Sequence, residues 1–227
     1  VKQVAGIAGN ARPSVDKKSI VIMCADNGVV EEGVSSCPKS VTASVTENFT
    51  RGITGVCVLG AHAGAGIVVV DVGVDAELQG VGVLDRKIRR GTWNMAKGPA
   101  MTREEAIKGI ETGIETVNEL SRKGVQLLGT GEMGIGNTTT SSAMAAAFTG
   151  KPLETLVGRG SGLTDEGLCK KIKVIKRAIE VNKPDASDPL DVLSKLGGFD
   201  IAGLTGCFMG AAANRIPILI DGVIASV

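Results

Sequence analysis

Four short apolar runs constrain the fold of this 227-residue chain most, because they are continuous and do not alternate with polar positions. Runs of this kind predict strands that are buried on both faces, as in a parallel sheet. They occupy residues 19–25, 66–72, 125–129 and 216–220. The intervening segments repeat apolar residues at the helical period, in the ranges 41–49, 53–63, 103–123, 165–181, 189–196 and 200–213.

Strands that alternate with helices predict an α/β fold with right-handed crossovers and helices on both faces of the sheet. Helix 103–123 has the clearest boundaries, because Thr102 and Glu105 have the spacing of a capping box and Gly124 follows as a stop. Residues 183–189 form a loop that is too short to separate two domains. We therefore expect one α/β core domain over residues 1–227.

Polar residues follow the strands, and the carboxyl ends of parallel strands form the ligand-binding edge of such sheets. A local role is open for two of them, because Asp26 can form an Asx turn or a helix cap and Asp221 can cap the chain before Gly222. Their recurrence at successive strand ends favours a shared pocket. The acidic residues placed on this edge are Asp26, Asp71, Glu132 and Asp221.

The glycine-rich stretch 129–140 carries the strongest functional signal. Gly134 and Gly136 let backbone N–H groups approach a ligand, and the helix expected to start near Asn137 and Thr138 supplies unpaired donors. A phosphate is the natural occupant. Because a carboxylate repels phosphate, we expect Glu132 to face a ring or reacting part of a phosphorylated substrate; the alternative is a cap on residues 137–139.

A second glycine-rich loop, residues 159–162, contains Gly160 and precedes a helix with three lysines at 170, 171 and 173. At helical spacing only one of these lysines can face inward, so at most one is a phosphate partner. The alternative is that all three belong to a solvated helix face.

The spacing Gly129-x-Gly131-x-x-Gly134 also matches the dinucleotide-binding fingerprint. The match is weak, because no acidic residue ends a following strand about twenty residues later, as that fingerprint requires. The stretch also lacks the Gly-Lys-Ser/Thr sequence of a P-loop. A nicotinamide-dependent oxidoreductase therefore stays an alternative function.

Several classes of function are excluded by composition. A single histidine, His62, argues against His-based triads and multi-histidine metal sites, and five widely spaced cysteines argue against a zinc site. We expect no metal and no cofactor. The net charge of +1 lacks the excess of positive charge that would attract nucleic acid or an anionic membrane. No apolar run reaches the ~18 residues of a membrane span and no export signal is visible, so we expect a cytoplasmic protein.

Four motifs resemble those of the nicotinate-nucleotide–dimethylbenzimidazole phosphoribosyltransferases, which make α-ribazole phosphate for the lower ligand of cobalamin. They are ADNGVVEEGVS at 25–35, VDVGV at 70–74, GEMGIGNTT at 131–139 and KLGGFDIAG at 195–203. The resemblance covers nearly the whole chain in the same order. It implies a three-layer, Rossmann-like parallel sheet, a smaller helical part built from both termini, and a homodimer.

The resemblance also implies roles for individual residues. The turn from Gly134 to Thr138 and Lys171 would hold the phosphate of nicotinate mononucleotide, with Gly160 nearby. Asp221 and Gly222 would lie near its ribose or nicotinate. The segment that follows Asp26 and runs through Ser36 to Ser44 would border the pocket for 5,6-dimethylbenzimidazole or a related base. The implied reaction yields α-ribazole 5′-phosphate and nicotinate, with inversion at C1′.

Two departures from the family pattern bear on the chemistry. Asn27 stands where the family usually has histidine. The family's general-base glutamate belongs to a segment expected beyond Val227, and an N-terminal helical segment is also expected outside this chain. Glu132 is then the base, a substitute base or an electrostatic support. A nucleotide-binding subunit without activity of its own is the other alternative.

Overall fold

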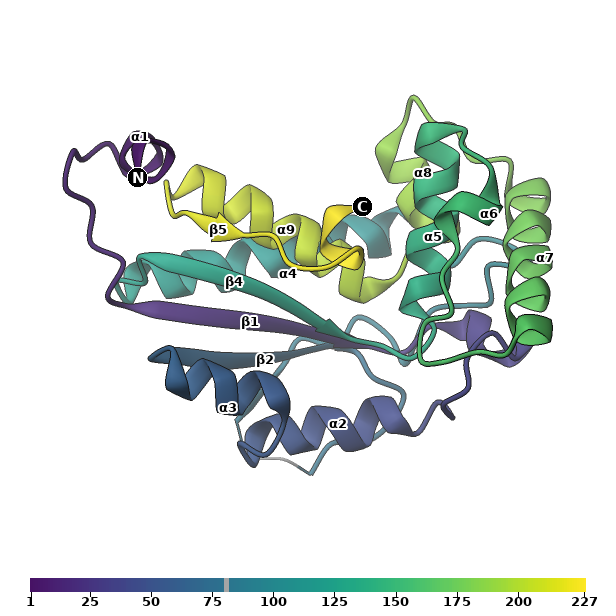
Figure 1. The fold of residues 1–227 in the computed structure, drawn as a ribbon, viewed down its shortest axis with the longest axis horizontal. Helices are drawn as coiled ribbons and strands as arrows, with labels where there is room; N and C mark the ends of the chain where they lie inside the picture. Colours follow the sequence, from purple (N-terminus) through teal and green to yellow (C-terminus); the bar gives the residue numbers. More distant parts are fainter. Residues whose placement is uncertain (80–81) are drawn as a thin grey trace.

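A parallel five-stranded sheet forms the centre of the protein in a computed structural model that describes residues 1–79 and 82–227 (Figure 1). The strand order is β3-β2-β1-β4-β5, and every neighbouring pair is parallel. The strands are β1 (Lys18–Ala25), β2 (Ala65–Gly73), β3 (Val83–Asp85), β4 (Leu127–Met133) and β5 (Ile218–Leu219). The order reverses direction at β1, so the carboxyl ends of β1 and β4 border the switch point where ligands bind in such sheets.

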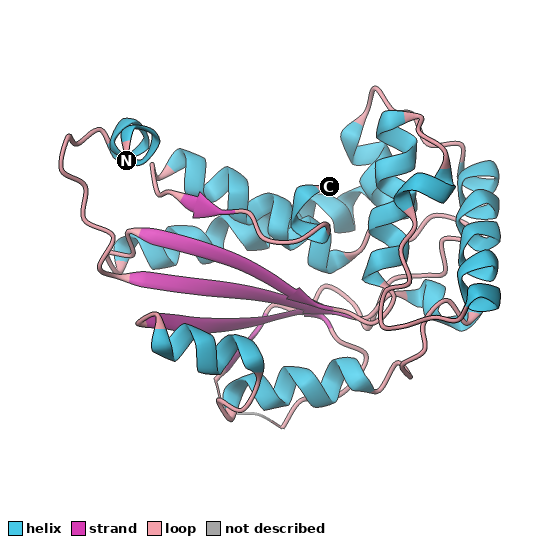
Figure 2. Cartoon of the chain, in the orientation of Figure 1, coloured by secondary structure: helices cyan, strands magenta, loops and turns pink. Residues whose placement is uncertain are grey.

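Helices cover both faces of the sheet (Figure 2). Helices α2 (Val41–Thr50) and α3 (Gly55–His62) lie on one face, and α4 (Arg103–Arg122) and α9 (Phe199–Ala213) lie on the other. A further group of helices lies beyond the carboxyl end of the sheet in Figure 1. Its members are α5 (Asn137–Thr149), α6 (Leu153–Leu156), α7 (Asp165–Asn182) and α8 (Pro189–Leu196). Helix α1 (Lys2–Ala8) and two 3-10 helices, Gly28–Glu32 and Ile224–Ser226, complete the fold.

Helices α4 and α9 pack backbone against backbone. A Cβ added to Gly113 of α4 would lie 2.8 Å from Gly206 Cα and 2.7 Å from Cys207 N, both in α9. Contacts below 3.0 Å are not tolerated by real side chains, so glycine is needed where these two helices cross. Their close contact covers one face of the sheet with a continuous apolar core.

Most of the elements expected from the sequence are confirmed. Strands β1 and β2 extend the expected runs by a residue or two, and α8 has the expected bounds. The capping box of α4 is present: Thr102 Oγ1 accepts from Glu105 N at 3.1 Å, and Thr102 N donates to Glu105 Oε2 at 2.9 Å. The short elements β3, α1 and α6 were not expected, because a few residues carry no measurable period.

The expected strand 125–129 was placed too early. Strand β4 begins at Leu127 and runs to Met133, so Gly129, Gly131 and Glu132 belong to the strand and not to a bend. The reason is pairing: β4 adds to β1 in register from Leu127 opposite Lys18 to Met133 opposite Cys24. The bend is confined to residues 134–136, and α5 begins directly after it at Asn137. The expected strand 216–220 is reduced to the two residues of β5.

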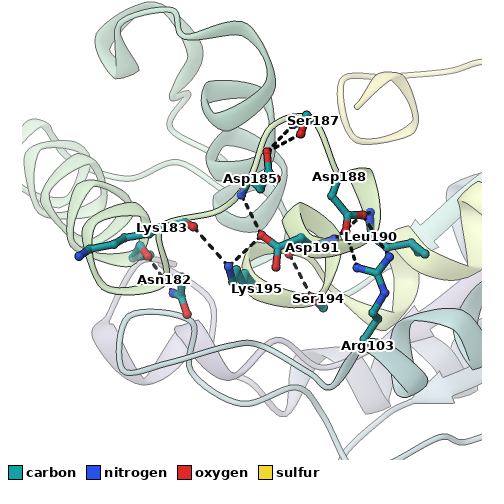
Figure 3. A network of polar contacts seen from close by, with 11 residues as sticks. Arg103, Asn182, Lys183, Asp185, Ser187, Asp188, Leu190, Asp191, Ser194 and Lys195 are labelled. Carbon is teal, nitrogen blue, oxygen red and sulfur yellow. Dashed lines mark hydrogen bonds and ion pairs between the residues drawn. The ribbon is translucent and has the colours of Figure 1, made fainter.

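The loop 183–189 is held by a polar network around the start of α8 (Figure 3). Asp188 caps this helix by accepting from Leu190 N at 3.1 Å, and it also pairs with Arg103 at 2.6 Å. Asp191 accepts from Asp185 N and from Lys195 Nζ, both at 2.8 Å. The network ties the loop to α8 and to α4. Among the described residues, no helix is long and apolar enough to cross a membrane.

Candidate active site

A cavity of about 140 Å³ opens at the carboxyl end of β4. Its walls come from three segments: the end of β4 with the first residues of α5, the loop before α7, and the loop before α2. The lining residues are Val34, Ser35, Glu132, Met133, Gly134, Ile135, Gly136, Asn137, Thr138, Gly160 and Ser161. Six of the residues expected from the sequence therefore share one cavity: Glu132, Gly134, Gly136, Asn137, Thr138 and Gly160.

The turn between β4 and α5 forms the floor of this cavity. Gly136 is the N-cap of α5 and has a φ of 94°, a left-handed conformation that favours glycine. Without a side chain, Gly136 cannot cap the first turn of α5, and a Cβ at this position would lie 2.7 Å from Val30 Cγ2. Asn137 N and Thr139 N donate within the turn, to Gly134 O at 3.0 Å and to Gly136 O at 2.8 Å. Asn137 and Thr138 of the first turn line the cavity, so the positive dipole end of α5 faces it.

Lys171 is buried behind the cavity, with 0% of its surface exposed, whereas Lys170 and Lys173 are exposed. This agrees with the expectation that at most one of the three lysines can face inward, and it rules out the alternative that all three lie on a solvated face. Lys171 Nζ donates to Thr138 Oγ1 at 2.8 Å and to Gly158 O at 3.1 Å. Desolvation lowers the pKa of Lys171 to about 8, and no carboxylate among the described residues acts on it. A buried ammonium without an anionic partner is unfavourable unless a ligand supplies the negative charge.

The loop before α7 closes over Lys171. Gly160 has a φ of 55°, and a Cβ there would lie 3.0 Å from Thr138 Oγ1 and 3.6 Å from Lys171 Nζ. The loop before α2 meets it, because Ser36 Oγ donates to Ser161 O at 2.9 Å and lies 2.8 Å from Ser161 Oγ. Ser36 thus joins the two loops at the rim of the cavity.

Glu132 lies at the end of β4 with its carboxylate toward α5. Its Oε1 accepts from Asn137 Nδ2 at 3.2 Å. Burial raises the pKa of Glu132, and the nearby charge of Asp221 raises it further. The expected alternative role as a helix cap does not match this contact, because Glu132 bonds to the Asn137 side chain and not to a backbone N–H of α5. A half-buried carboxyl with a raised pKa is suited to accept a proton or to stabilise positive charge.

Several expected residues lie outside the cavity. Ser44 is exposed on α2, where its Oγ donates to Ser40 O of its own chain segment at 3.2 Å. Asp221 and Gly222 are exposed in the segment after β5. The negative charge of Asp221 influences the site only by raising the pKa of Glu132. Asp71 bonds to Gly73 N and Val74 N and pairs with Lys87 at 3.0 Å, which is a structural role.

Asp26 is buried at the end of β1, and its Oδ2 accepts from Asp75 N at 2.8 Å. It therefore fixes the loop after β2 and does not line the cavity. Sequence reasoning missed Ser161 at the rim, and it missed the buried Asp200 beneath the turn. Loop contacts and tertiary burial leave no periodic signal in the sequence, so neither residue could be found from a pattern alone. His62 is exposed at the end of α3.

Metal-ligating side chains do not gather at this site or elsewhere in the described part of the chain. Within residues 1–79 and 82–227, no cluster of three or more His, Cys, Asp or Glu side chains could hold a metal ion.

Comparisons with known proteins agree with this geometry. A family model described as Phosphoribosyltransferase matches residues 1–227. Nicotinate-nucleotide–dimethylbenzimidazole phosphoribosyltransferase from Ruminiclostridium cellulolyticum is 66% identical over 226 residues, which are 100% of this chain and 64% of that protein. The enzyme of the same name from Acetivibrio thermocellus is 63% identical, with the same coverage.

Among solved structures, the crystal structure of CobT from Thermus thermophilus superposes with a TM-score of 0.94 at 37% identity, over 99% of this chain and 67% of that chain. The chain thus spans slightly less than two thirds of the length of the two sequence relatives. The family model, the sequence relatives and the structural match agree over essentially all of this chain. The chain belongs to this phosphoribosyltransferase family.

Proposed function

We propose that the protein containing this chain transfers the phosphoribosyl group of nicotinate mononucleotide to 5,6-dimethylbenzimidazole or a related base. The products are α-ribazole 5′-phosphate and nicotinate, with inversion at C1′. The names of the relatives support the two substrates. The cavity at the carboxyl end of β4 supports a phosphorylated substrate.

One observation carries the proposal: Lys171 is a fully buried cation with two neutral hydrogen-bond partners and no carboxylate partner among the described residues. It lies against Thr138, in the first turn of α5, so the ammonium and the helix N-terminus act on the same point. Together they favour a dianionic phosphate over a neutral ligand.

The carboxyl group of Glu132 lies on the same cavity wall, held by Asn137. With the phosphate at Lys171, Glu132 faces the sugar or ring part of the substrate. The glycosidic nitrogen of nicotinate mononucleotide is a pyridinium, so the C1′–N bond breaks to release a neutral ring. One nitrogen of the incoming base forms the new bond to C1′ from the opposite face, and its other nitrogen loses a proton.

We assign Glu132 to stabilising the positive charge that develops on the sugar and the incoming base. It serves as a proton acceptor when no better base is in place. The principal base is the carboxylate that the family resemblance assigns to a segment after Val227. Assembly as a homodimer and a cytoplasmic location are part of the proposal, and light scattering and cell fractionation test them.

No observation supports the alternative function as a nicotinamide-dependent oxidoreductase. Gly129 and Gly131 lie inside β4, paired with Ile20 and Ile22 of β1, so they form no phosphate-binding turn. A Cβ on Gly129 would lie 3.3 Å from Ile20 Cγ1, which explains this glycine by packing.

The test uses the protein at the full length of its relatives, purified and given nicotinate mononucleotide and 5,6-dimethylbenzimidazole. Chromatography is expected to show free nicotinate and a nucleotide in equal amounts, and NMR of the anomeric proton should identify the α configuration. The reaction should persist with a chelator. Activity that vanishes with chelator and returns with a divalent ion would contradict the proposal, and activity only with an added partner protein would favour the silent-subunit alternative.

A further inference from the structure

Two polar side chains are sealed beneath the cavity floor. Asn27 follows β1, and Asp200 lies in the first turn of α9; both have 0% of their surface exposed. They lie between two glycines. A Cβ on Gly134 would lie 2.6 Å from Asp200 Oδ2 and 2.9 Å from Asn27 Nδ2, and a Cβ on Gly198 would lie 2.5 Å from Asn27 Oδ1 and even closer to Asp200 Oδ1.

These contacts define how the two groups face each other. On the Gly134 side, Asn27 Nδ2 donates to Asp200 Oδ2 at 3.5 Å. On the Gly198 side, Asp200 Oδ1 accepts from Ile201 N at 3.0 Å, and Asn27 Oδ1 also lies next to Gly198. Asn27 Oδ1 has no hydrogen-bond donor among the described residues, although it is buried. This is the arrangement of a carboxylic acid paired with an amide, in which the acid O–H supplies the donor that the amide oxygen lacks.

An ionised Asp200 has only acceptors, so it would leave the buried Asn27 Oδ1 without a donor. The ionisable groups that act on Asp200 also oppose its ionisation. Burial and the charge of Glu132 in β4 raise the pKa of Asp200 to about 7. Burial, with a smaller contribution from Asp200 and other carboxylates, raises the pKa of the Cys24 thiol to about 12, so this thiol stays neutral beside Asp200.

The pair supports the residues that line the cavity. Gly134 begins the turn between β4 and α5, and it rests on Asp200, Asn27 and the Ala25 carbonyl. Gly136 lies over Asn27, because a Cβ there would be 3.5 Å from Asn27 Cβ. A shift of either partner therefore moves the turn that carries Glu132 on one side and Thr138 on the other.

We propose that Asp200 is a positioning residue: in its protonated form it closes an acid–amide pair with Asn27, and this neutral pair holds the turn 134–136 under the ligand. A neutral pair also keeps a second negative charge away from Glu132 and an anionic substrate. The role for the ligand rests on the proposed function, whereas the pair itself does not depend on it.

Asp200→Asn tests the pair, because an amide in this place keeps both hydrogen bonds with Asn27 and cannot ionise; it gives up only the bond that Asp200 Oδ1 accepts from Ile201 N at 3.0 Å. The infrared band of a protonated carboxyl is expected in the wild-type protein at pH 6 and should be lost from Asp200→Asn. Because the pKa is raised in the folded state, the stability due to the proton is present at low pH and is lost as pH rises toward about 7. The melting temperature of the wild type relative to Asp200→Asn should therefore fall between about pH 4 and pH 7 and stay level above it.

Nicotinate mononucleotide is the probe for positioning. At pH 6, Asp200→Asn should bind it within about threefold of the wild type, and Asp200→Leu should bind it at least about tenfold more weakly, through the loss of both hydrogen bonds. Asp71→Asn is a matched control, because Asp71 is also buried but is bound by Lys87 and two backbone N–H groups. This control should leave the carboxyl band in place and should lower the melting temperature at pH 7, where the pair with Lys87 is lost.

Two results would overturn the inference: an unchanged carboxyl band in Asp200→Asn, or a loss of binding in folded Asp200→Asn at pH 6 as large as that of Asp200→Leu. If the wild-type protein does not bind nicotinate mononucleotide at all, the proposed function and the positioning role fail together. The infrared band and the melting curves would still decide the acid–amide pair.

Discussion

Gly134→Ala is the substitution that most directly tests the geometry of the cavity floor. The new methyl group would lie 2.6 Å from Asp200 Oδ2 and 2.9 Å from Asn27 Nδ2, and it would clash with the backbone carbonyl of Ala25. The carbonyl belongs to the end of β1, and both side chains are fully buried, so none of the three neighbours has free space to move into. The turn itself must therefore shift.

Gly131→Ala is a matched control three residues earlier in β4. Its Cβ would lie 3.6 Å from Ile22 Cγ1 and 3.9 Å from Val21 O, which are ordinary contacts. Overpacking of a closed site costs about 1–3 kcal/mol, which corresponds to a fall in melting temperature of roughly 2–12 °C for a domain of this size. The control should change stability by less than about 1 kcal/mol, with a small gain possible from reduced freedom of the unfolded chain.

The assay is thermal unfolding, followed by calorimetric titration of nicotinate mononucleotide well below the lower melting temperature. Gly134→Ala should melt earlier and bind about tenfold more weakly or worse, because the displaced turn carries the phosphate-binding end of α5. Gly131→Ala should bind as the wild type does and should melt within about 4 °C of it. Equal stability and equal affinity of the two variants would refute the proposed packing of the turn on Asn27 and Asp200.

Two further predictions concern the charged groups of the site. Glu132→Gln keeps size and hydrogen bonding but removes charge and basicity. Steady-state kinetics with both substrates varied should therefore show kcat falling by about tenfold or more while KM changes less, and an unchanged kcat would remove Glu132 from the chemistry. Because the pKa of Lys171 is lowered to about 8, the affinity for nicotinate mononucleotide should weaken as pH rises above about 8, by at most about tenfold per pH unit. Lys171→Ala should abolish this pH dependence, and a flat profile in the wild type would contradict the phosphate role.

The layers of the fold follow from local signals in the sequence. Strand β1 is a continuous apolar run, α4 has its capping box, and α8 has Asp188 before a proline at its first position. Each of these signals acts within a few residues, so it can be recognised in the sequence without knowledge of tertiary contacts. The end of β4 was misplaced because glycines 129 and 131 have poor strand propensity, and pairing with β1 overrides that propensity.

The site was only partly predictable, because tertiary contacts, which leave no local signal in the sequence, place several of its residues. Helical spacing allows at most one of the three lysines to face inward, and the choice of Lys171 required the family resemblance. Asp200 has no local signal at all, because its burial arises from Gly134 and Gly198, which are 66 and 2 residues away in the chain. Ser44 was assigned to the pocket only by resemblance, and in the structure its hydroxyl bonds within its own helix segment.

The central claim is that Lys171 holds the phosphate of the substrate. Calorimetric titration of the wild type and Lys171→Ala with nicotinate mononucleotide, and with the riboside that lacks the phosphate, tests it as a double-mutant cycle. A charge-assisted contact of about 1.5–3 kcal/mol predicts a loss of roughly 10- to 150-fold for the mononucleotide and almost none for the riboside. Lys173→Ala, at an exposed position, should change neither affinity. Equal losses for the two ligands in Lys171→Ala would show that Lys171 does not bind the phosphate, and would contradict the account.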